Sequence, residues 1–104
     1  SMTDVAHLAE LHIREQESRL QHIDELVERA RKGAGSAPGF AHIYTELDDL
    51  VRRRDQNAVK LDDYKTRAAE KWREEEIEKS GLMGIWDALA QQLETLVEKL
   101  ERKG

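Results

Sequence analysis

The chain has no cysteine, a single proline and few aromatic residues, which make up 5% of its 104 residues. Without cysteine it can form no disulfide and can use no thiolate as a nucleophile. It also lacks any apolar run near the ~20 residues that a membrane-spanning helix needs. Neither sign of charge dominates, since 22 acidic residues stand against 17 basic ones. The net charge of −5 disfavours broad binding to nucleic acid or to an anionic membrane surface.

Charged and apolar residues are abundant instead, at 38% each. This balance is typical of long solvated helices, and the apolar residues recur at helical spacing, which a disordered tail does not need. The length fits one domain. No signal peptide is recognisable, and Ser1 before Met2 resembles the remnant of a cleaved tag. We therefore expect one cytoplasmic domain over residues 1–104.

Two Gly-rich stretches, residues 33–39 and 80–84, divide the chain into three segments with heptad patterns. The apolar residues of each segment fall into the a and d columns of a coiled coil. These columns predict helices over about residues 3–32, 38–79 and 82–102. Representative members are Ile13, Leu20, Ile23 and Val27 in the first segment, Ile43, Leu47, Leu50 and Leu61 in the second, and Leu89, Leu93, Leu96 and Leu100 in the third.

The ends and lengths of these helices predict an architecture. Gly33 is the expected stop of the first helix, and Pro38 is the expected first residue of the second. At 1.5 Å per residue the helices measure roughly 45, 60 and 30 Å. Short connections favour antiparallel neighbours, so the second helix returns along the first and the third folds back over the end of the second. We expect an elongated antiparallel three-helix bundle whose thin core and surplus apolar columns favour a homodimer.

Three histidines each precede a glutamate by three residues, a spacing that could place two metal ligands on one helix face. The pairs are His7/Glu10, His12/Glu15 and His22/Glu25. Their heptad positions are on the flank or the outside of the helix, whereas a bundle metal centre needs inward ligands from several helices. His42 has no second ligand in a suitable pattern. We expect a solvated charged face here, with no metal and no cofactor.

The densest basic run is Arg52-Arg53-Arg54. It could contact an anion or an acidic partner. However, Arg52 and Arg53 follow Asp48 and Asp49 by four residues, which favours ion pairs on one mixed face. A second basic cluster with interleaved aromatic residues, which would favour nucleic acid, is missing.

Arg54 differs from its neighbours because it falls in the a column, close to Asn57 in the d column. A polar layer inside an apolar seam costs stability and commonly fixes register or oligomeric state. We expect Arg54 to reach a carboxylate or the edge of the bundle, because an unpaired buried guanidinium is costly. Gln16 of the first helix is a candidate hydrogen-bond partner for Asn57.

Trp72 and Trp86 are the large aromatic anchors, and at their spacing they are expected in the core, which could itself include a dimer interface. Residues 33–39 are unlike a phosphate loop, because no Lys-Ser/Thr pair follows and no strand precedes them. No Ser-His-Asp arrangement can be inferred, so we expect a non-enzymatic protein. The candidate partner contacts are Tyr44, Val51, Arg54, Asn57, Tyr64, Trp72 and Trp86.

The second segment also resembles a known family. Its order of Tyr44, spaced leucines, Arg54-Asp55 and Lys60-Leu61, followed eleven residues later by Trp72, is similar to that of small bacterial coiled-coil proteins of the cyanobacterial stress-response type. Trp86 matches a second tryptophan that opens their last amphipathic helix. The resemblance extends over roughly residues 44–100, although the spacing between the tryptophans is longer here. It implies a non-enzymatic, stress-linked coiled-coil protein.

Two readings of function follow. The first is a non-catalytic bundle that acts through protein–protein contacts with itself and with another protein, as a stress-related adaptor or scaffold. The alternative is an acidic inhibitor, immunity protein or chaperone-like partner that masks an effector, a toxin or a nucleic-acid-binding enzyme. A concentrated acidic face would favour the alternative, and an even distribution of charge would favour the adaptor.

Overall fold

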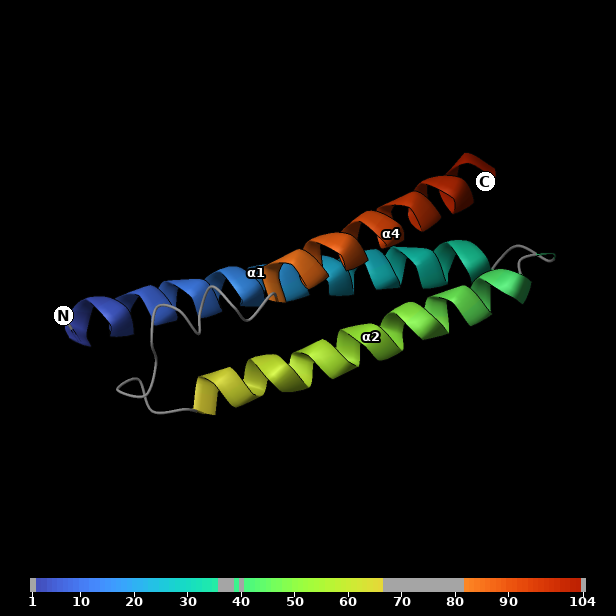
Figure 1. Ribbon diagram of the computed structural model, residues 1–104. Coiled ribbons are helices and arrows are strands. Elements are labelled where there is room, and N and C mark those ends of the chain that lie inside the picture. Colours follow the sequence, from blue (N-terminus) through green and yellow to red (C-terminus); the bar gives the residue numbers. More distant parts are fainter. Residues whose placement is uncertain (1, 36–38, 40, 67–81, 104) are drawn as a thin grey trace.

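The computed structural model describes residues 2–35, 39, 41–66 and 82–103. These residues form α1 (Met2–Gly35), α2 (Ala41–Thr66) and α4 (Leu82–Lys103), as Figure 1 shows. No strand occurs within the described ranges. The three helices pack against one another, with the most extensive contact between α1 and α4. The predicted all-α three-helix bundle is therefore confirmed.

The helices lie nearly along one axis in a molecule that measures 56 × 19 × 17 Å. Figure 1 shows that α2 runs back along α1 and that α4 returns in the direction of α1. Cross-helix ion pairs agree with these directions. Glu17 of α1 pairs with Lys65 of α2, and Asp24, further along α1, pairs with Arg54, which comes earlier in α2. This opposite order is what antiparallel helices require. The predicted directions of the three helices are thus confirmed, whereas the predicted end of the second helix, over which the third was expected to fold, lies outside the described residues.

The core is a continuous apolar seam between the three helices. Its residues come from the predicted a and d columns and from the positions that flank them. The buried apolar side chains are Ile23, Leu26, Val27, Ala30 and Ala34 on α1, Ile43, Leu47, Leu50 and Leu61 on α2, and Trp86, Leu89, Leu93, Leu96, Val97 and Leu100 on α4. Gln16 and Asn57 are the two polar residues buried among the described side chains.

The first helix does not stop at Gly33 but continues to Gly35, so the predicted end was wrong. The reason is visible in the core, where buried Ala34 extends the a column one heptad beyond Val27. Gly33 has a different role from the one expected. A Cβ atom built on it would lie 3.1 Å from Cβ of Leu100. The glycine therefore lets α1 and α4 approach closely near their C-terminal ends.

The start of the second helix also differs from the prediction. Gly39 lies in a turn with φ of +104°, in the left-handed region that glycine tolerates best, and α2 begins at Ala41. Pro38, the predicted first helical residue, lies outside the described residues. So does the predicted continuation of this helix over 67–79, including Trp72. None of the helices that the structure describes is long and apolar enough to cross a membrane.

Gly33 of α1 and Gly84 of α4 should respond differently to replacement by alanine. Gly84 of α4 is exposed, and a Cβ there would meet nothing within 4 Å, so Gly84→Ala should raise the free energy of unfolding by about 0.5–1 kcal/mol through helix propensity. Gly33→Ala has the same propensity gain but must displace Leu100. Thermal unfolding followed by circular dichroism should show stabilisation for Gly84→Ala only. Equal stabilisation by both variants would contradict a tight contact at Gly33.

Candidate interaction site

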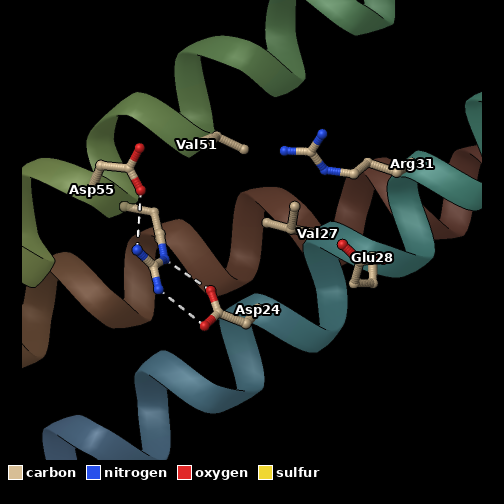
Figure 2. A pocket seen from close by; sticks show the side chains of 7 residues that line it. Asp24, Val27, Glu28, Arg31, Val51 and Asp55 are labelled. Carbon is tan, nitrogen blue, oxygen red and sulfur yellow. Dashed lines mark hydrogen bonds and ion pairs between the residues drawn. The ribbon is translucent and has the colours of Figure 1, made fainter.

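Among the described residues, a cluster of polar contacts is built around Arg54, which binds Asp24 of α1 and Asp55 of α2 where these two helices meet (Figure 2). Its guanidinium binds Asp24 of α1 through two parallel hydrogen bonds, Nε to Oδ1 at 2.8 Å and Nη2 to Oδ2 at 3.0 Å. Nη1 donates a third bond to Oδ1 of the adjacent Asp55, at 3.0 Å. The prediction that Arg54 reaches a carboxylate is confirmed. The fork-to-fork geometry is the strongest form of arginine–carboxylate pairing.

The position of Arg54 in the helix explains its environment. It occupies the a column between Leu47 and Leu61, and its side chain is 26% exposed. The stem therefore packs at the edge of the seam while the guanidinium lies at the surface. The hydrogen bond to Asp24 is the main cause of the raised pKa of Arg54, whereas the partial burial of the guanidinium acts to lower this pKa. Because both carboxylates already hold this cation, it is poorly placed to bind an anion from elsewhere.

Asn57 and Gln16, the other members of the expected polar layer, do not pair with each other. Asn57 Nδ2 donates to the backbone oxygen of Arg53 in its own helix, at 2.7 Å. Gln16 Oε1 accepts a long hydrogen bond of 3.4 Å from Nε1 of Trp86 on α4. The proposed Gln16–Asn57 contact was therefore wrong, because each amide finds a different partner. Within the described part of the chain, Gln16 Nε2 has no hydrogen-bond partner.

A row of polar contacts along the α1–α4 seam was not foreseen. His22 Nε2 lies 3.1 Å from Oε1 of Glu94, and one heptad further on Arg29 binds both carboxylate oxygens of Glu101, at 2.7 and 3.3 Å. Arg19 pairs with Asp87 on the same side. The hydrogen bond to Glu101 raises the pKa of Arg29. The seven-residue step shared by the two helices is the sequence feature that could have revealed these pairs.

These contacts between helices take the place of i,i+4 ion pairs within α1. Arg19 and Arg29 bind carboxylates of α4 rather than Glu15 and Glu25, the glutamates one turn earlier. Glu10 and Arg14 do form an i,i+4 pair within α1, at 2.8 Å. Half-exposed pairs of this kind contribute little stability each, and all of them fit the parallel arrangement of α1 and α4.

The basic run on α2 forms a mixed face, as its sequence indicates. Arg52 and Arg53 both lie near Asp49, at 3.7 and 3.9 Å, whereas neither pairs with Asp48. Arg53 also donates to the side-chain oxygen of Gln92 on α4, at 3.2 Å. Its positive charge is therefore shared between two neighbours.

The remaining candidate contacts lie in different environments. Trp86 is fully buried in the core of the chain, as the expectation of a core role requires. Val51 and Tyr64 are half-buried against the core, whereas Tyr44 is 44% exposed. Trp72 lies outside the described residues. The structure brings Val51 and Arg54 together in one cleft with Asp24 and Asp55, and it separates Trp86 from them.

The histidines do not form the pairs that their spacing suggested. His22 contacts Glu94 of another helix rather than Glu25, and His7 and His42 are exposed. His12 is half-buried, and its Nε2 has no hydrogen-bond partner among the residues described. Across the described ranges, no three His, Asp or Glu side chains gather in a group that could hold a metal ion.

Comparison of the chain with protein-family models, with curated protein sequences and with solved structures gives no match.

Proposed function

We propose that this chain is a non-catalytic helical-bundle protein that acts in the cytoplasm through protein–protein contacts, as a stress-related adaptor or scaffold. The observation that carries the proposal is the division of the side chains between an apolar interior and a polar exterior. Apart from Gln16 and Asn57, the buried residues described are apolar, so the inward positions supply packing. The clusters of polar groups lie on the outside, where Arg54 is already paired.

The surface offers apolar area beside these charges. Tyr44 is an exposed large side chain, and Val51, one heptad along the same column of α2, is half-buried beside the cleft between α1 and α2. Apolar side chains framed by charged ones are typical of transient protein interfaces. The resemblance of roughly residues 44–100 to stress-linked coiled-coil proteins supports the same class of function.

The distribution of charge favours the adaptor over the acidic inhibitor. The acidic excess is two residues in α1 and one each in α2 and α4. Many of the carboxylates are also neutralised by arginine, as in the pairs of Asp24, Asp49 and Glu101. An inhibitor of a basic effector needs a concentrated negative field, and an even distribution provides less of it.

The proposal predicts a dimer and a partner. Multi-angle light scattering of the full chain at micromolar concentration should give twice the monomer mass of 12.0 kDa. Affinity purification from stressed and unstressed cells, followed by mass spectrometry, should recover a protein that Tyr44→Glu no longer retains. Tyr44→Glu changes an exposed residue, so circular dichroism should show an unchanged fold. A strictly monomeric chain that retains no protein would refute the proposal.

A further inference from the structure

In the columns of α1 and α2 that face each other beside the core, one cation has no partner among the residues that the structure describes. On this side Glu17 pairs with Lys65, at 3.7 Å, and seven residues later Asp24 holds Arg54. Seven residues further along α1, the side chain of Arg31 extends toward Val51, whose apolar side chain cannot accept a hydrogen bond from the guanidinium (Figure 2). Arg31 is exposed and forms no ion pair within the described part of the chain.

An unpaired anion lies one turn away from this cation. Glu28 is also exposed and also forms no ion pair with any described residue. Both side chains line the cleft of about 320 Å³ between α1 and α2, whose apolar part is made by Val27 and Val51. The site therefore combines one free negative charge, one free positive charge and an apolar floor.

This combination is complementary to itself. If two copies meet about a two-fold axis that passes between positions 28 and 31, α1 and its copy run antiparallel. Glu28 of each copy then faces Arg31 of the other, and both unpaired charges are satisfied at once. A partner with only one sign of charge would satisfy one of the two groups and repel the other. The half-buried Val51 would lose its remaining exposure in such a contact.

We infer that the face of α1 that carries Glu28 and Arg31, together with Val51 and Tyr44 of α2, is the contact between two copies of this chain. The inference rests on the proposed function, of which the homodimer is a part. It adds the surface, the antiparallel orientation of the two α1 helices and the charge pairs that set their register.

A charge exchange tests the contact. In the dimer, residue 28 of each copy faces residue 31 of the other copy. Glu28→Arg therefore places two arginines opposite each other at both of these contacts, and Arg31→Glu places two glutamates opposite each other. Each variant alone should raise the dimer dissociation constant at least about tenfold, because like charges in an interface are costly. An equimolar mixture of the two variants should form a heterodimer with a dissociation constant near that of the unaltered chain. Native mass spectrometry and sedimentation equilibrium measure both quantities.

Matched controls are available on α4. Glu98→Arg and Lys99→Glu make the same changes of charge at exposed positions away from this face, and they should leave the dissociation constant unchanged. Circular dichroism should show equal helicity for all variants, since all four side chains are exposed. A dimer that neither exchange weakens would overturn the assigned surface and leave the dimer itself standing. A monomeric unaltered chain would overturn both.

Discussion

Replacing Trp86 with alanine should cause a large loss of stability. The indole is fully buried at the N-terminal part of α4, against the core that α1 and α2 contribute. Loss of a fully buried large aromatic side chain costs about 3–5 kcal/mol, because the surrounding helices collapse only partly into the cavity. For a domain whose total stability is about 5–15 kcal/mol, this loss should lower the melting temperature by well over 10 °C.

Trp86→Phe separates packing from hydrogen bonding at this position, and a substitution at an exposed residue provides the control. Trp86→Phe retains most of the ring volume but loses the 3.4 Å bond to Gln16, so it should cost much less than the alanine variant. Val59→Ala truncates an apolar residue of α2 that is 68% exposed and should change the free energy of unfolding by about 0.5 kcal/mol or less. Urea unfolding at fixed protein concentration gives all three values. An alanine variant as stable as the phenylalanine variant would show that the cavity is refilled.

The inward positions could be predicted from the sequence because burial follows a simple period. Leu89, Leu93 and Leu96 recur at coiled-coil spacing, and all are buried as expected. The directions of the described helices followed from the same pattern and from the short connections that it predicts. The position of Arg54 in the a column was enough to predict that its guanidinium reaches a carboxylate or the edge of the bundle, because a buried guanidinium without a partner is costly.

The identity of each partner could not be predicted in the same way. Arg29 has Glu25 one turn away in its own helix, yet it binds Glu101, which is 72 residues distant. Which heptad of α4 lies beside which heptad of α1 depends on how the cores of the two helices interlock, and a single sequence does not contain that register. Gln16 contacts Trp86 instead of Asn57 for the same reason.

Glycine raised a separate difficulty. Gly33 and Gly39 lie in the same Gly-rich stretch, but one is helical and packs against Leu100, and the other is a turn residue with positive φ. The residue type permits both conformations. Only the burial of Ala34 between them extends α1 past the first glycine.

Replacing both Arg54 and Asn57 with leucine should make the protein more stable and its assembly less specific. The two residues interrupt the apolar columns of α2 between Leu50 and Leu61, at positions that are 26% and 6% exposed. Leucine at both positions would extend the seam and remove the desolvation cost of a guanidinium and an amide. Asp24 is about half exposed, so it can return to water when its partner is removed. The backbone oxygen of Arg53, to which Asn57 Nδ2 donates, lies within a helix and can keep its i+4 partner.

The expected gain is about 1–3 kcal/mol, which corresponds to a rise in melting temperature of at least about 4 °C for a domain of this size. The oligomer distribution measured by native mass spectrometry should broaden at the same time, because a uniform apolar seam no longer penalises slipped registers. Asp24→Asn is the matched control. It weakens the fork around Arg54 but keeps the guanidinium in place, so it should lower the melting temperature.

We expect the double substitution to raise the melting temperature and to broaden the oligomer distribution. The experiment therefore separates the effect of the two residues on stability from their effect on the specificity of assembly. If the polar layer mainly stabilised the bundle, the double variant would melt lower than the unaltered chain and would keep one sharp oligomeric state. That outcome would show that the fork between Arg54 and Asp24 is required for the α1–α2 contact. A higher melting temperature with several oligomeric states would show that Arg54 and Asn57 reduce stability and in return restrict the helices to one register.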